Sequence, residues 1–176
     1  MSIGCRAQHE SVFWASKNYG SLFMERLLSD DLKEFLRFLN EEKVEYLLIG
    51  GWAVGYYGYP RLTQDMDVWV EMSARNAARI LRSLTRFGFT HGETDAALFL
   101  NAGNIVRFGF PPNRIEILNQ ISGVEFADCV GRKEMADFDG LLVPVIGLED
   151  LIQNKRASGR HKDLADIEGL NRDVVE

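Results

Sequence analysis

The chain has 176 residues, of which 46% are apolar and 26% charged, and these proportions are typical of a folded globular domain. They exclude disordered, collagen-like and fibrous proteins. The 20 basic and 26 acidic side chains give a net charge of −6, so no overall positive field attracts nucleic acid or anionic membranes. The two cysteines are far apart and the three histidines are scattered, which argues against a zinc cluster.

The N-terminal segment does not predict a signal peptide, because charged residues such as Arg6 and Glu10 interrupt it. The most apolar run, residues 46–57, is too short to span a bilayer, which takes about 20 residues. We therefore expect a cytoplasmic protein with no membrane partner. No Pro- or Ser-rich linker marks an internal boundary, so we predict an N-terminal extension over residues 1–28 and a single domain over residues 29–176.

The first half of the chain predicts alternating helices and strands. Ser29 is followed by two aspartates and by apolar residues at helical spacing, which is the pattern of a capped amphipathic helix. Farther on, residues 65–71 alternate in the manner of a strand. The predicted elements are a helix from Ser29, a strand over 44–49, a short helix over 52–58, a strand over 65–71 and a helix over 73–87 that Ser73 caps.

In the second half, short apolar runs are separated by glycine, asparagine and proline, as they are between strands. Helical spacing returns near the C-terminus. The order of the elements predicts an α/β (α+β) fold, in which a mixed β-sheet has flanking helices and a C-terminal helical segment follows. The predicted elements are strands over 97–100, 105–110, 114–118 and 141–146, and helices over 148–157 and 162–170.

Two aspartates lie two residues apart in the strand predicted over 65–71. Asp65 and Asp67 therefore leave the same face of the sheet, about 6 to 7 Å apart at the backbone, and repel each other. A divalent cation such as Mg²⁺ would relieve the repulsion, because it prefers carboxylate oxygens. Glu116, between two inward-facing isoleucines, is a candidate third ligand. An exposed strand edge, or ion pairs with Arg61, would also explain the two aspartates.

Gly50 and Gly51 follow a predicted strand and precede a predicted short helix. Bare backbone N–H groups at such a place can bind phosphate, although a tight turn is the simpler explanation of two glycines. Arg61 and Thr63 lie between these glycines and the paired aspartates. A phosphate-binding turn shortly before paired carboxylates is more specific than either feature alone.

This group of residues resembles the active-site motif of the DNA polymerase β-like nucleotidyltransferase superfamily. The motif residues are Gly50, Gly51, Ala53, a Gly-aromatic-Pro-Arg stretch ending at Arg61, Thr63, Asp65 and Asp67. The resemblance is greatest to the minimal nucleotidyltransferases that include toxins of abortive-infection toxin–antitoxin systems, and it implies that Arg61 and Thr63 help to bind the nucleotide. Trp52 departs from the serine common in the superfamily, as it does in the lincosamide-modifying nucleotidyltransferases.

The C-terminal stretch from Leu148 to Leu170 is similar to a second motif of the same proteins. That motif is a lysine, an arginine, a Lys-Asp pair and a further aspartate, here Lys155, Arg160, Lys162, Asp163 and Asp166. The resemblance implies that Lys155 and Arg160 bind the triphosphate and that Asp163 or Asp166 assists. Taken alone, the two aspartates would be a helix-start charge and a helix-surface partner of Lys162.

The resemblance implies an enzyme, a nucleotidyltransferase that moves a nucleoside monophosphate from an NTP to an acceptor hydroxyl. Asp65, Asp67 and Glu116 would hold one or two Mg²⁺ (or Mn²⁺) ions, and Gly50 and Gly51 would bind the β- and γ-phosphates. Glu116 is either the ligand nearest the acceptor or the general base. The acceptor would be an RNA end, a protein or a small molecule, and an antitoxin-like protein is an implied partner. A catalytically silent member of the same fold, either a binding module or one half of a toxin–antitoxin pair, is the alternative.

Four arginines, Arg75, Arg79, Arg82 and Arg86, form a stripe along the helix predicted over 73–87. A solvated helix face explains this stripe. Contact with RNA or with an acidic partner is the alternative, because such a stripe can bind phosphates on an acidic chain.

Overall fold

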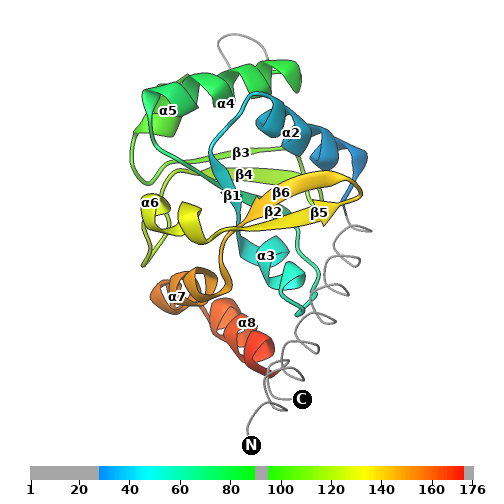
Figure 1. The fold of residues 1–176 in the computed structure, drawn as a ribbon, viewed down its shortest axis with the longest axis vertical. Helices are drawn as coiled ribbons and strands as arrows, with labels where there is room; N and C mark the ends of the chain where they lie inside the picture. The colour runs from blue at the N-terminus through cyan, green and yellow to red at the C-terminus, as the bar shows by residue number, and fades with distance from the viewer. Residues whose placement is uncertain (1–27, 90–94, 173–176) are drawn as a thin grey trace, which may run out of the picture.

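The computed structural model describes residues 28–89 and 95–172, and its centre is a β-sheet with helices on both faces (Figure 1). The predicted N-terminal extension lies outside the described residues except for Leu28. The strands are β1 (Tyr46–Leu48), β2 (Asp65–Val70), β3 (Ile105–Phe108), β4 (Arg114–Leu118), β5 (Glu134–Phe138) and β6 (Leu141–Val145). The helices are α2 (Asp30–Glu41), α3 (Gly50–Tyr56), α4 (Ala74–Arg86), α5 (Ala97–Leu100), α6 (Phe126–Cys129), α7 (Leu148–Ser158) and α8 (His161–Arg172), with the short 3-10 turn η1 (Val130–Arg132). No helix in this described part of the chain has the length and apolar character needed to cross a membrane.

The sheet is mixed, and β2 lies in its interior. The strand order is β3-β4-β2-β1-β6-β5, with β2 antiparallel to β1 and parallel to β4. The register sets Asp67 beside Glu116, and β3 sets Arg107 on the other side of Glu116. Residues paired across strands point to the same face of a sheet, so these three side chains share one face. The predicted mixed α+β fold is confirmed.

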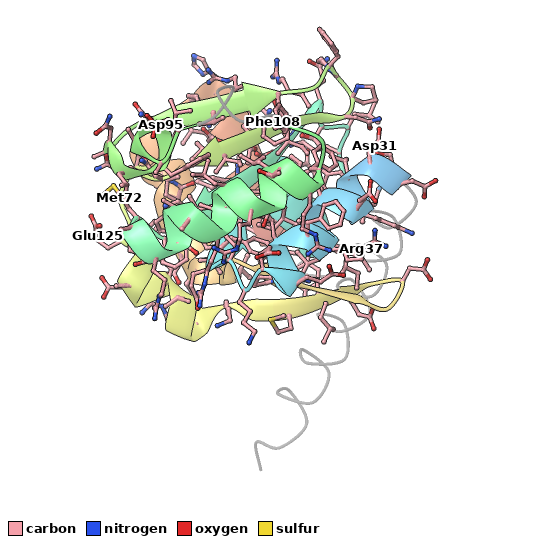
Figure 2. All side chains as sticks on the ribbon, turned by 90° about the horizontal axis from the view of Figure 1, so that it is seen from above. Asp31, Arg37, Met72, Asp95, Phe108 and Glu125 are labelled. Atoms are coloured by element: carbon pink, nitrogen blue, oxygen red, sulfur yellow. The ribbon has the colours of Figure 1, made fainter. Side chains whose placement is uncertain are left out.

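The opposite face of β2 carries the hydrophobic core. Met66, Val68 and Val70 are completely buried there, and α2 and α4 cover them (Figure 1). Figure 2 looks down on this layer, with α2 and α4 in front of the strands. Phe35 of α2 packs edge-to-face on Phe108 of β3, with ring centroids 5.6 Å apart. Each fully buried large apolar side chain contributes roughly 1.5–3 kcal/mol, so this layer holds β2 in place from behind.

Both predicted serine caps are confirmed. Ser29 Oγ accepts a hydrogen bond from the Leu32 N–H at 3.4 Å, and Ser73 Oγ accepts one from the Asn76 N–H at 3.2 Å. The helices α2 and α4 begin one residue after these caps. Gly50 and Gly51 do not form a separate turn before the short helix predicted over 52–58. They are the first two residues of α3, which begins at Gly50.

The strand predicted over residues 97–100 is wrong, since these residues form the short helix α5. Asp95 Oδ1 accepts a hydrogen bond from the Ala97 N–H at 3.2 Å, as at a helix start, and Phe99 is the buried residue of the four. An apolar run this short is compatible with either structure by pattern alone. Strand β5 was not predicted, because it lacks β-branched residues and forms through its pairing with β6.

The arginine stripe joins α4 to the end of α2. Arg82 Nε donates to Glu42 Oε2 at 2.7 Å, and Arg86 Nη1 donates to the other oxygen of this carboxylate at 3.2 Å. Arg79 Nη1 donates to the backbone carbonyl of Lys43 at 2.8 Å. These contacts favour the explanation of the stripe as a solvated helix face that also joins two helices.

Asn76 is a buried amide that ties α4 to the ends of β1 and β2. Its Oδ1 accepts a hydrogen bond from the Glu45 N–H at 2.8 Å, and its Nδ2 donates to the carbonyls of Glu45 and Glu71, both at 2.9 Å.

Asn76→Ala leaves three backbone groups without this partner, so we expect the free energy of unfolding to fall by about 2 to 4 kcal/mol. Urea denaturation followed by circular dichroism measures the loss. The exposed neighbour serves as control, because Arg75→Ala should cost less than about 0.5 kcal/mol. Equal losses in the two variants would contradict the role given to Asn76.

Candidate active site

The three carboxylates predicted from the sequence gather on one face of the sheet. Asp65 and Asp67 project from β2 and Glu116 projects from β4, with Asp67 and Glu116 paired in the register. Glu116 is buried and both aspartates are partly buried. Over residues 28–89 and 95–172, no group of three or more His, Cys, Asp and Glu side chains is arranged to hold a metal ion by itself. A metal bound at this place would therefore take part of its coordination from substrate and water, as Mg²⁺ usually does.

Two arginines that the sequence analysis did not identify neutralise two of these carboxylates. Arg114 Nη2 donates to Asp65 Oδ2 at 2.7 Å, and Arg107 Nε donates to Glu116 Oε1 at 2.9 Å. Arg114 Nε also lies 3.4 Å from Glu116 Oε1. Strand alternation places both arginines on the same face as the acids, but only the pairing of β2, β3 and β4 brings them together.

Among the three carboxylates, Asp67 is the one that has no cationic partner in residues 28–89 and 95–172. Its side chain has no hydrogen bond or ion pair with any other described residue. Burial, followed by the negative charges of Asp65 and Glu116, raises the pKa of Asp67 to about 6. Because this pKa still lies below 7, Asp67 is ionised at neutral pH, and the three carboxylates carry more negative charge than Arg107 and Arg114 neutralise, a feature common where proteins bind cations or do chemistry.

The glycine pair brings bare backbone against the acids. Gly50 has a φ of +64°, and a Cβ added to it would lie 1.9 Å from Asp67 Oδ2. A Cβ on Gly51 would lie 2.8 Å from Thr63 Oγ1. Both positions therefore require glycine, the first for its backbone conformation and its close approach, the second for its approach alone.

Besides Arg114, Thr63 and Trp52 hold Asp65 in place. The Thr63 hydroxyl lies within hydrogen-bond distance of the Asp65 carbonyl, at 3.1 Å, and of its Oδ1, at 3.3 Å. The indole N–H of Trp52 donates to the same carbonyl at 3.1 Å, and the Trp52 side chain is buried. The tryptophan that departs from the usual serine thus supports the first residue of β2.

Lys155 lies in a buried ion-pair cluster between α7 and α8. Its Nζ donates to Asp163 Oδ1 at 2.9 Å and to Asp166 Oδ2 at 2.7 Å, and its side chain is only 4% exposed. Arg160 and Ser158 also donate to Asp163, at 2.6 and 2.7 Å. Although burial opposes ionisation, these hydrogen bonds lower the pKa of Asp163 to about 2.

Arg61 connects this cluster to the glycine pair. Its guanidinium donates two hydrogen bonds to Asp166, at 2.6 and 2.8 Å, and its Nη1 would lie 3.3 Å from a Cβ on Gly51. Arg61 therefore does not supply the cation for the paired aspartates of β2, as the simpler explanation of them required. In the described part of the chain, Asp166 finds its partners in Arg61 and Lys155, not in Lys162.

The predicted site residues form one connected group on the face of the sheet that α3, α7 and α8 cover (Figure 1). Register and close approaches join, in order, Glu116, Asp67, Gly50, Gly51, Thr63, Arg61, Asp166, Lys155, Asp163 and Arg160. The positive charges of Lys162 and Lys155 act on Asp67 against the larger effect of burial. The C-terminal cations therefore lie within electrostatic reach of the acids.

Comparison with known proteins supports the resemblance to nucleotidyltransferases. Residues 28–176 match a protein family described as "Nucleotidyl transferase of unknown function (DUF2204)". Among solved structures, the chain is similar to a 1.87 Å crystal structure of a "putative nucleotidyltransferase" from Thermotoga maritima. The two chains are 19% identical, the match covers 80% of this chain and 88% of the other, and the TM-score is 0.53, which shows a shared fold. None of the curated proteins compared with the chain matches it.

Asp67 makes the stability of the metal-free protein depend on pH in a defined direction. Folding raises the pKa of this carboxyl from 3.8 to about 6, so the folded state binds more protons and the free energy of unfolding falls as pH rises through this window. Asp67→Asn removes the cost of holding an ionised carboxylate at this place. We therefore expect the free energy of unfolding of the variant to exceed that of wild type by about 1 to 2 kcal/mol at pH 7, and the two values to converge near pH 4.

Thermal unfolding in EDTA at the two pH values tests this expectation. The matched control is Asp65→Asn, which gives up the ion pair with Arg114 and should not gain stability at pH 7. The role given to Asp67 would be wrong if both variants gained equally, or if the advantage of Asp67→Asn were independent of pH.

Proposed function

The chain belongs to this family of nucleotidyl transferases, and we propose that it moves a nucleoside monophosphate from an NTP to an acceptor hydroxyl with the help of Mg²⁺ or Mn²⁺. The observation that carries the proposal is the position of Asp67. This carboxylate has no partner among the described residues, lies beside Glu116 in the register, and faces the bare backbone of Gly50. An uncompensated carboxylate next to the first backbone N–H groups of a helix suits a divalent cation together with the phosphates that it binds.

The donor atoms of the site are suited to such a metal. Asp65 and Asp67 would hold it and Glu116 would be the third ligand, since all three offer carboxylate oxygens from one sheet face. The absence of a side chain at Gly50 leaves free the space against Asp67 Oδ2 that a Cβ would fill. A metal ion bound there supplies positive charge that stabilises the charge developing on the phosphoryl oxygens.

The proposed reaction forms one P–O bond and breaks another. The acceptor oxygen attacks the α-phosphorus of the NTP, the bond from this phosphorus to the oxygen that bridges to the β-phosphate breaks, and pyrophosphate leaves. The proton of the acceptor hydroxyl passes to Glu116 or to water. Thr63 and Trp52 orient the reacting site by fixing the start of β2 at Asp65.

The triphosphate would lie against the start of α3. The first N–H groups of a helix have no intrahelical partner, so those of Gly50 and Gly51 can donate to phosphate oxygens. Arg160 can contact a phosphate while it holds Asp163, because its side chain is 75% exposed. Arg61, 20% exposed, adds positive charge beside the glycines.

Lys155 has a different role in this proposal from the direct triphosphate contact that the resemblance implies. Its ammonium is enclosed by Asp163 and Asp166, and removing one partner of a buried ion pair is costly. We therefore assign Lys155 to the positioning of these two aspartates, which in turn hold Arg160 and Arg61 toward the site.

A catalytically silent binding module of the same fold is the second candidate function. The observation that favours it is that Arg114 and Arg107 already neutralise Asp65 and Glu116. The two candidates differ in what happens to the nucleotide, because a silent module binds an NTP and releases it unchanged.

Transfer of the α-phosphate separates these candidates directly. The protein is incubated with Mg²⁺, total cellular RNA, cell protein and each NTP labelled at the α-phosphate. We expect label on RNA or protein, lowered at least about 100-fold by Asp65→Ala combined with Asp67→Ala, because in the proposed reaction these carboxylates stabilise the transition state through the bound cation.

Two controls accompany this assay. The same NTPs labelled at the γ-phosphate should leave the acceptor unlabelled, since that phosphate departs with pyrophosphate. Asp30→Ala removes an exposed carboxylate of α2, on the far side of the sheet, and should retain activity. Nucleotide binding by calorimetry without any transfer would support the silent module.

The resemblance to abortive-infection proteins adds a biological setting, the toxin of a toxin–antitoxin pair. In this setting, induced expression of the wild-type protein in a host that lacks the antitoxin arrests growth, and expression of the doubly substituted Asp65→Ala, Asp67→Ala protein does not. Growth curves at matched protein levels measure the difference. Equal growth with both proteins would remove the toxin role and leave the transferase proposal standing.

A further inference from the structure

Arg114 occupies the oxygens that a metal ion would need. Its guanidinium bridges two strands, with Nη2 at 2.7 Å from Asp65 Oδ2 and Nε at 3.4 Å from Glu116 Oε1. A cation placed between two carboxylates relieves the repulsion that these would otherwise exert on each other. The same oxygens cannot at once be fully engaged by the arginine and coordinate a metal.

The Arg114 guanidinium does not use all of its hydrogen-bond donors among the described residues. Its Nε is buried and makes no hydrogen bond within the described residues, because the approach to Glu116 lacks hydrogen-bond geometry. A buried donor without an acceptor lowers the net benefit of the contact. The side chains of Arg114 and Asp65 are also 32% and 20% exposed, so water can take over the freed charges. These features make the ion pair one that an incoming cation can displace.

We propose that Arg114 is an internal counter-cation that competes with divalent metal for Asp65, so that metal binds when Arg114 withdraws. The inference rests on the proposed function, because it concerns the same carboxylates. Arg114 thereby stabilises the metal-free site and lowers its affinity for metal. Once withdrawn, its planar guanidinium is free for a phosphate, with which it pairs through two parallel hydrogen bonds.

Arg107 provides the matched control. It lies across from Glu116 in the β3–β4 register and donates to Glu116 at 2.9 Å, so it carries the same charge next to the same cluster. Its side chain is 54% exposed, and among the described residues its ion pair is with Glu116 alone. Removing Arg107 therefore reports the general effect of one lost positive charge, and removing Arg114 reports that effect plus the release of Asp65.

The experiment measures the dissociation constant of Mn²⁺ by electron paramagnetic resonance for the full chain and its Arg114→Gln and Arg107→Gln variants. We expect Arg114→Gln to bind Mn²⁺ about tenfold more tightly than wild type, and Arg107→Gln to gain less than about threefold. Arg114→Lys keeps the charge but loses the planar fork, and it should lie between wild type and Arg114→Gln. Thermal unfolding verifies that each variant is folded.

A second readout follows the arginine itself. In a ¹H–¹⁵N spectrum of the arginine Nε groups, the Arg114 signal is identified by its loss in Arg114→Lys, and we expect it to shift when Mg²⁺ is added to the wild-type protein. Equal Mn²⁺ affinities in wild type and Arg114→Gln, or equal gains in Arg114→Gln and Arg107→Gln, overturn this inference and leave the proposed transferase intact. Failure of wild type and all variants to bind Mn²⁺, both alone and with NTP added, overturns both proposals.

Discussion

The structure around the site depends on one electrostatic constraint, the presence of three carboxylates on adjacent strands of one sheet face. Two like charges about 5 Å apart repel each other by roughly 3 kcal/mol at an effective dielectric constant near 20. A sheet tolerates such an arrangement only if cations stand among the acids and the strands are held firmly from behind. Arg107 and Arg114 provide the cations, and Met66 and Val68 anchor β2 in the core between α2, α4 and the strands.

The elements around the acids are arranged so that the backbone, rather than further side chains, approaches them. Gly50 allows α3 to begin directly against Asp67, and Gly51 admits the Thr63 hydroxyl that supports Asp65. The C-terminal helices α7 and α8 contribute positive charge from the same side. Lys155 of α7 forms its ion pairs with Asp163 and Asp166 of α8. Bare backbone at one edge of the site and fixed cations at another are the features on which the proposal of an anion that carries a metal ion rests.

Sequence reasoning predicted those features that depend on local rules. Ser29 and Ser73 cap their helices as their residue types require, and Asp65 and Asp67 share a face because strand side chains alternate. It failed where contacts across the fold decide. Residues 97–100 form a helix that buries Phe99, whose carbonyl accepts a hydrogen bond from the Asn119 amide at 3.2 Å, and β5 forms through its pairing with β6.

In the candidate site, too, local sequence patterns predicted some features and contacts across the fold determine the others. The residues themselves followed from the motifs, but their partners did not, because an arginine near an acid in sequence is a poor guide to its ion pair in space. Arg61 is four residues from Asp65 and pairs with Asp166, more than a hundred residues away, whereas Asp65 pairs with Arg114 from a neighbouring strand. Arg107 pairs with Glu116 and Arg114 pairs with Asp65, so Asp67 is the one of the three carboxylates without a partner in the described chain, and a cation bound there would displace no arginine. Under the proposed function, the net charge of −6 would not prevent the binding of a triphosphate, because a divalent ion carried with the nucleotide would supply positive charge beside Asp67.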